Sequence, residues 1–250
     1  MLPIGLSAPP RTHRPWATAV LTLVCVAVYV RLQLLRDAPP ALFCSDLTES
    51  RRSLQRASGS VQLFVCQYGA IPDDLVKGRH LLTLFTALFV HASWFHLLAN
   101  LLFLIAFAPR VEEDLGSGGL LALFVGSGVL GGVAHVLVAP NLVSPAIGAS
   151  GAVAGVMGAH LLLAPKQAQV RVLIGPVPLR LPSRFVIALW AVLQVAYAAW
   201  ALSRAEYPGG TSYEVHAVGF AVGVVVVGAW WWLRRFKDLT WRSDVGRPPG

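Results

Sequence analysis

The residues best suited to chemistry in this sequence begin at Ser150, which follows a loop rich in proline and glycine and starts an apolar helix expected over 150–164. A hydroxyl at a helix N-terminus lies beside backbone N–H groups that lack intrahelical acceptors, and the helix dipole is positive there. Such a position favours an alkoxide nucleophile and an oxyanion. Small residues recur along one side of the helix, and their spacing allows two helices to approach closely inside a bilayer. They are Ser150, Ala154 and Gly158, with Gly151, Gly155 and Ala159 beside them.

The composition is that of a polytopic membrane protein. Of the 250 residues, 56% are hydrophobic and only 13% are charged, and the mean hydropathy is +0.64. A soluble domain carries about 25% charged residues. The formal net charge is +8, but the basic residues cluster beside apolar runs, as the positive-inside rule and anionic lipids predict. We therefore expect the lipid bilayer, and not nucleic acid, as the partner of this surface charge.

The apolar runs predict an all-α membrane helix bundle with six transmembrane helices. The spans are expected over 16–35, 81–107, 120–139, 150–164, 185–202 and 215–233, and the basic stretch over 165–184 is expected to be a cytoplasmic loop. The sixth run ends in three tryptophans followed by Arg234 and Arg235, which is typical of the cytoplasmic interface.

This topology divides the chain into three parts. We expect a short cytoplasmic N-terminus over 1–15, a six-span membrane domain over 16–235 and a short cytoplasmic tail over 236–250. The core of the membrane domain covers 81–235, and a large extracytoplasmic loop covers 37–80. The protein is expected to be an integral, multi-pass protein of the plasma membrane, with both termini in the cytoplasm.

The helical rise places three polar side chains at a similar depth. Counted from the nearest charged anchors, Ser150 lies about 24 Å, His216 about 27 Å and His96 about 21 Å above the inner face. The span that starts at Ser150 is too short to cross the bilayer, so the loop over 140–149 must enter the membrane. Ionisable residues at such depth are costly, and they are hypotheses for a functional site.

The sixth span carries its histidine above a glycine stripe. His216, Gly219 and Gly223 are spaced i, i+3, i+7 and share one face. Because glycine has no side chain, this helix can press against the small face below Ser150. Close approach would bring the Ser150 hydroxyl within hydrogen-bond reach of a His216 ring nitrogen.

Two further polar residues lie on the second span. His96 and Asn100 are four residues apart, point the same way and can both donate hydrogen bonds. Hydrogen bonds between neighbouring helices are the alternative role for this pair.

Together these residues resemble the rhomboid family of intramembrane serine proteases. The resemblance covers about 81–235 and rests on Gly148-Ala149-Ser150-Gly151, on His216-Ala217-Val218-Gly219 with Gly223, and on His91, His96 and Asn100. It implies that Ser150 is the nucleophile, and that His216 is the general base and then the general acid. It also implies an oxyanion hole made of Asn100, His96 and the Ser150 backbone N–H, with His91, Gly148, Gly151 and Gly219 in supporting roles. Glu112 and Gly116 match the turn that follows the family's second span.

The sequence thus predicts a compact six-span, prokaryote-type rhomboid enzyme. It would hydrolyse peptide bonds in or near transmembrane segments of single-pass membrane proteins, using no metal and no cofactor, at a site open to the extracytoplasmic side. The alternative is a catalytically inactive rhomboid-like binder or chaperone of membrane helices. Such relatives usually lack the serine or the histidine, whereas this chain has both.

The remaining histidines and cysteines are given other roles. The i, i+5 spacing of His91 and His96 does not suit a zinc site. His135 and His160 lie away from the level of the site, and we expect them to be structural. Cys44 and Cys66 share the first loop and can pair if that loop is extracytoplasmic, the alternative being two free thiols.

Overall fold

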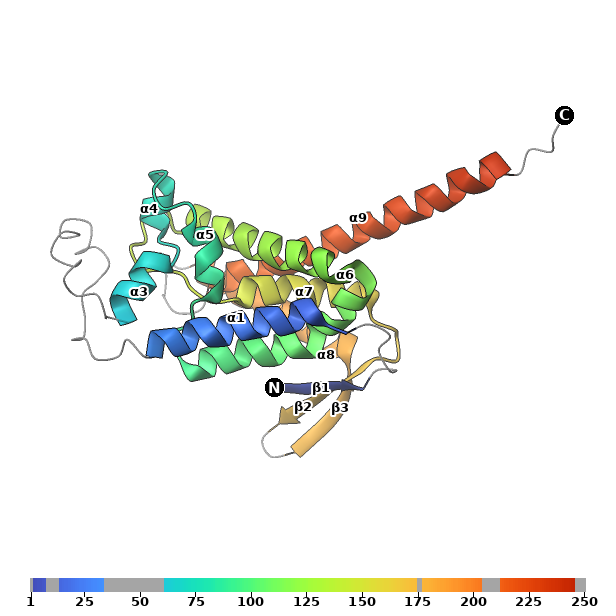
Figure 1. Cartoon of the computed structure of the whole chain (residues 1–250), viewed down its shortest axis with the longest axis horizontal. Coiled ribbons are helices and arrows are strands. Elements are labelled where there is room, and N and C mark those ends of the chain that lie inside the picture. Colours follow the sequence, from blue (N-terminus) through green and yellow to red (C-terminus); the bar gives the residue numbers. More distant parts are fainter. Residues whose placement is uncertain (1, 8–13, 34–60, 175–176, 204–211, 246–250) are drawn as a thin grey trace.

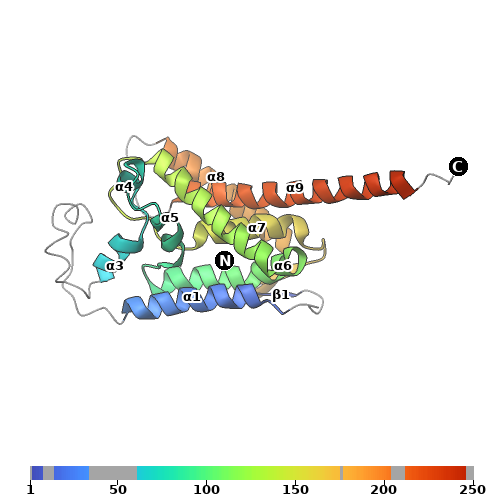
Figure 2. The same cartoon turned by 45° about the horizontal axis from the view of Figure 1, so that its top comes forward.

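The computed structural model describes residues 2–7, 14–33, 61–174, 177–203 and 212–245. Figure 1 shows a bundle of helices with a small sheet at its side, and the C-terminal half of the last helix projects away from the bundle. The helices are α1 (Trp16–Gln33), α3 (Val61–Tyr68), α4 (Pro72–Val76), α5 (Thr83–Thr86), the 3-10 helix η1 (Ala87–Phe89), α6 (Trp94–Val138), α7 (Ser150–Leu163), α8 (Ser183–Leu202) and α9 (Tyr213–Val245). Figures 1 and 2 both place α7 in the middle of the bundle, and its residues 151–160 are all buried.

The longest helix, α6, is two helices joined by a sharp bend at Gly116. This residue has φ 74° and ψ 166°, a backbone conformation that is open to glycine and strained for other residues. The two arms, 94–115 and 117–138, are each about 33 Å long, close to the thickness of a bilayer. They correspond to the second and third predicted spans, and the first arm lies beside α1 (Figure 1).

The bend is fixed to α1 by the buried carboxylate of Glu112. Its oxygens accept hydrogen bonds from the backbone N–H groups of Ala17 (2.7 Å) and Thr18 (2.9 Å). They also accept from the hydroxyls of Thr18 (2.8 Å) and Ser117 (2.7 Å). Glu112 thus supplies acceptors for two unpaired N–H groups at the start of α1, where a negative charge is favoured by the helix dipole.

Replacing Glu112 by alanine is expected to lower the free energy of unfolding by about 3 kcal/mol, because it leaves several donors without an acceptor inside the protein. Thr18→Val removes only one donor from the same carboxylate and should cost about 1 kcal/mol. Denaturant unfolding in detergent micelles, followed by tryptophan fluorescence, measures both. Equal losses for the two variants would contradict this account of Glu112.

The fold is mostly helical rather than all-α as predicted, because the basic loop forms strands. The strands β2 (Gln169–Ile174) and β3 (Val177–Pro182) pair antiparallel with Arg171 opposite Arg180. The strand β1 (Leu2–Ser7) pairs antiparallel with the other edge of β2. Val170 and Val172 are buried and Arg171 is exposed, the alternation that a half-buried strand requires. The alternation of Val170, Arg171 and Val172 is the signal in the sequence for this strand, and the prediction of a basic loop rested on the charges alone.

Two helix boundaries differ from the prediction. The second span was expected from residue 81, but 81–93 form α5, η1 and a short irregular segment before α6 begins at Trp94. The last helix continues to Val245, through most of the segment expected as a cytoplasmic tail. Cys66 is disulfide-bonded and Cys25 is free. The alternative of two free thiols is therefore wrong for Cys66, and Cys44, the other cysteine of that expectation, lies outside the described residues.

Candidate active site

Ser150 is the first residue of α7 and is half-buried. Its backbone N–H is therefore among those that a helix leaves without an intrahelical acceptor. The loop before it is held by backbone hydrogen bonds to two other segments. Ala146 exchanges two with Ala70 (2.8 and 3.0 Å), and the N–H of Gly148 donates to the Ala87 carbonyl (2.9 Å). These bonds fix where the serine enters the bundle.

The serine opens onto a cavity of about 580 Å³ at this end of α7. The walls come from α5, η1, both arms of α6, the loop over 140–149, α7, α8 and α9, and most lining residues are apolar or glycine. The polar exceptions are Ser150, His216, His96, Asn100 and Ser212. The structure therefore brings the predicted nucleophile, the predicted base and the two side chains of the predicted oxyanion hole, from three different helices, into one mostly apolar cavity.

His96 lies directly against the loop that leads to Ser150. Gly148 has φ +115°, and a Cβ added there would be 2.6 Å from the His96 Nε2 atom. A glycine at this position therefore allows the imidazole to reach the loop two residues before the serine. One turn further along α6, the Asn100 Nδ2 group donates to the His96 carbonyl (3.0 Å), which leaves its second N–H for the cavity.

Helices α7 and α9 cross at glycines, as predicted from their small-residue stripes. A Cβ added at Gly219 would collide with the carbonyl oxygen of Gly151, and one added at Gly223 with that of Gly155. At Gly151 a Cβ would lie 2.6 Å from the Val215 Cγ1 atom. The two backbones are therefore in direct contact just below the level of Ser150 and His216.

The imidazole of His216 is held by α8. Its Nδ1 atom lies 2.6 Å from the Oε1 atom of Gln194. The Trp190 ring lies one turn earlier on α8, 5.8 Å from the imidazole and inclined by 35°. Gln194 was not among the predicted site residues. The available signal was a carboxamide in the middle of an otherwise apolar span, which is costly unless it is bonded.

His91 supports the cavity from behind. It is fully buried, and its ring meets that of His96 edge-on with the centroids 5.1 Å apart. Its Nδ1 atom lies 3.2 Å from the Phe89 carbonyl oxygen, which is an acceptor only, so this nitrogen donates. His91 is not among the residues that line the cavity but contacts His96, which does line it, and the supporting role of His91 stays a prediction.

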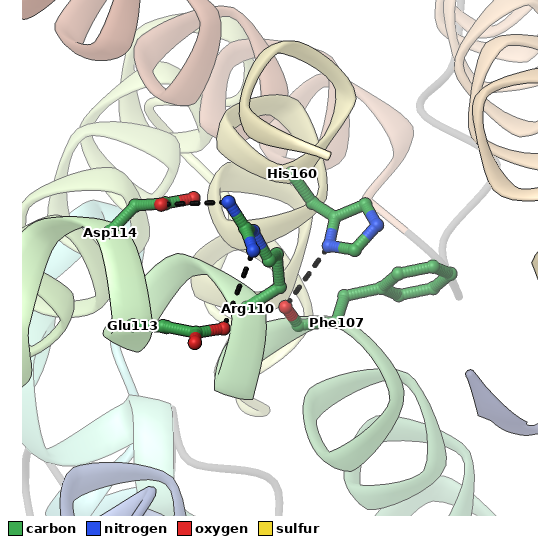
Figure 3. Close-up of polar contacts among 5 residues, drawn as sticks. All are labelled: Phe107, Arg110, Glu113, Asp114 and His160. Atoms are coloured by element: carbon green, nitrogen blue, oxygen red, sulfur yellow. Dashed lines mark hydrogen bonds and ion pairs between the residues drawn. The ribbon is translucent and has the colours of Figure 1, made fainter. Parts of the chain in front are cut away.

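The other two buried histidines have partners away from the cavity. His135 on α6 bonds Glu214 at the start of α9 (2.7 Å), and both side chains are buried. His160 on α7 donates through Nδ1 to the Phe107 carbonyl on α6 (3.2 Å), and Figure 3 shows this bond beside Arg110, which pairs with Glu113 and Asp114. These contacts join α9 and α7 to α6. Both histidines link helices, as expected of structural residues.

Nearly all of the residues that form this cavity lie within a segment that matches a known protein family. The family model described as "Rhomboid domain" matches residues 78–233. The chain belongs to the rhomboid family. The matched segment contains every residue that lines the cavity except Ala70. It also contains all the residues by which the sequence resembles the rhomboid proteases.

Curated relatives include other rhomboids. The chain is 29% identical to Rhomboid-like protein 11, chloroplastic, of Arabidopsis thaliana, over 97% of this chain and 87% of the relative. It is 36% identical to Putative rhomboid protease YdcA of Bacillus subtilis over 32% of this chain and 40% of the relative. Rhomboid protease GluP of the same organism is 33% identical over 39% of this chain and 18% of the relative. The chain thus matches less than half the length of both relatives that are named as proteases.

The helices of this rhomboid suit an integral membrane protein. Among the described residues, three helical segments are long and apolar enough to cross a bilayer: Trp94–Val138, Ser183–Leu202 and Tyr213–Arg234. Trp16–Arg31 and Ser150–Leu163 are apolar but shorter. The short helix that carries Ser150 therefore begins inside the bundle, where its neighbours enclose it.

Proposed function

We propose that this rhomboid is an intramembrane serine endopeptidase. The observation that supports it most is the shared cavity, which is lined by a serine at a helix N-terminus together with His216, His96 and Asn100. Two relatives that carry protease in their names support the same activity. The mostly apolar walls lower the local dielectric constant, which strengthens electrostatic interactions with the reacting groups.

The proposed reaction is acyl transfer through Ser150. Its Oγ attacks the carbonyl carbon of the scissile peptide bond while His216 accepts the hydroxyl proton. The Ser150 backbone N–H, the Asn100 amide and His96 donate hydrogen bonds to the resulting oxyanion. The C–N bond then breaks as His216 gives the proton to the leaving amine. A water molecule, deprotonated by His216, attacks the acyl-enzyme and releases the second product.

The proposed substrates are single-pass membrane proteins cut in or near their transmembrane segments. The apolar helices, with the two arms of α6 taken separately, support six crossings. The basic residues that follow the tryptophans of α9 favour a cytoplasmic C-terminus under the positive-inside rule. On this topology the N-terminus is also cytoplasmic and Ser150 opens toward the extracytoplasmic side. We also propose that the protein lies in the plasma membrane.

Labelling of the purified protein with a fluorophosphonate serine probe tests the proposal. We expect wild type to be labelled at Ser150, and Ser150→Ala and His216→Ala to lose at least about nine-tenths of the signal, because an unactivated hydroxyl is a weak nucleophile. Circular dichroism checks that all three proteins are folded. A folded wild type that neither takes up the probe nor cleaves a transmembrane substrate would favour the alternative, a rhomboid-like binder of membrane helices.

A further inference from the structure

The contact with Gln194 determines which ring nitrogen of His216 carries the proton. The carboxamide oxygen of Gln194 can only accept hydrogen bonds, so a His216 Nδ1 atom 2.6 Å away must carry the proton. A neutral imidazole holds one N–H. The Nε2 atom of His216 is therefore left with its lone pair, which is what a general base needs to take a proton from a serine.

The environment of Gln194 makes this contact hard to exchange for another. Gln194 is half-buried on α8, within a run of apolar residues. Loss of a hydrogen bond by an amide is costly in apolar surroundings, so the hydrogen bond of Gln194 to His216 is favoured. Trp190 flanks the same imidazole from one turn earlier on α8. The ring of Tyr213 approaches it edge-on, with the centroids 6.3 Å apart. The imidazole is thus held both in position and in rotation.

We propose that Gln194 is the positioning residue of this site, which fixes the Nδ1-protonated tautomer of His216 and aims Nε2 at Ser150. The inference rests on the proposed function. Gln194 would take the place that a carboxylate holds in a serine-histidine-aspartate triad, where loss of the correct tautomer costs about 10⁴-fold in rate. A neutral amide orients the ring without stabilising the imidazolium through charge, so a smaller effect is expected here.

Steady-state cleavage of a transmembrane substrate tests this role. Gln194→Leu removes the acceptor and keeps the apolar bulk, and it should lower kcat by about 10- to 100-fold with KM changed less than about twofold. Gln194→Glu restores an acceptor at the same length and should return kcat to within about fivefold of wild type. Val195→Leu, at a neighbouring residue that is 58% exposed, is the matched control on α8 and should behave as wild type.

A second measurement does not depend on activity. In protein labelled with ¹⁵N-histidine, the Nδ1 and Nε2 shifts report the tautomer of His216, assigned among the seven histidines by its loss in His216→Phe. The Nδ1-protonated form should dominate in wild type and give way to a mixture in Gln194→Leu. An Nε2-protonated His216 in wild type, or the same tautomer in Gln194→Leu, would overturn the inference.

The two measurements separate the inference from the function on which it rests. If wild type cleaves the substrate and Gln194→Leu is equally active, the role of Gln194 is refuted. The proposed protease activity is then still supported. A wild type that is inert toward both substrate and probe would refute the protease, and the tautomer shifts would still decide whether Gln194 controls His216.

Discussion

Replacing Ser150 by alanine is expected to lower the cleavage of a transmembrane substrate by ~10³-fold or more, because it removes the hydroxyl that is proposed to form the acyl-enzyme. His216→Ala should fall to a similar level, since it removes the acceptor of the serine proton. Residues that act as a unit are not additive, so the double variant should be no slower than the slower single variant. Product formation in proteoliposomes, measured by gel or mass spectrometry, gives all three rates.

Ser127 provides the matched control for the loss of a hydroxyl. It is a fully buried serine on α6 that is not among the residues lining the cavity, and its hydroxyl donates to the Leu123 carbonyl of its own helix (2.6 Å), with a longer contact to the Ala152 carbonyl of α7 (3.4 Å). Ser127→Ala should therefore keep cleavage within about twofold of wild type. Normal turnover by Ser150→Ala would refute the serine mechanism. A comparable loss in Ser127→Ala would show that the effect comes from packing.

Much of the cavity could be predicted because it depends on spacing within single helices. The small stripe after Ser150 and the glycine stripe after His216 each follow from 3.6 residues per turn, and both contribute to the contact of α7 and α9. Counting the helical rise from charged anchors placed Ser150, His216 and His96 near one depth, and all three line the cavity. Their catalytic roles stay predictions, because geometry alone does not test activity.

The contact of Gln194 with His216 could not be predicted from the sequence, for a physical reason. Its contact with His216 depends on how α8 rotates about its own axis and on where it packs against α9, and neither follows from the spacing of residues within α8. Glu214 was overlooked for the same reason, since its partner His135 is 79 residues away on another helix. The sheet was not predicted because the charges over 165–184 favoured a loop. The alternation of buried Val170 and Val172 with exposed Arg171 is the pattern that indicates a strand.

The glycine contact between α7 and α9 gives the second large effect. Gly223→Ala is expected to lower the free energy of unfolding by about 3 kcal/mol, at the upper end of the cost of overpacking. The added methyl would collide with the Gly155 carbonyl oxygen and come within 3.0 Å of the Ala159 nitrogen. Both obstacles are backbone atoms of a buried helix, so the methyl can be accommodated only if α7 and α9 move apart. Such movement would also carry His216 away from Ser150, and cleavage should fall together with stability.

Gly228 offers the same substitution on the same helix without the obstacle. No heavy atom lies within 4 Å of a Cβ added there. Since alanine favours a helix over glycine by about 1 kcal/mol, Gly228→Ala should leave stability unchanged or raise it by that amount. The two variants share their chemistry and differ only in what the methyl meets, so opposite signs in denaturant unfolding would identify the helix contact as the cause. A similar loss of stability in both would mean instead that α9 tolerates no added methyl anywhere, and that the crossing with α7 has no special part in holding the cavity together.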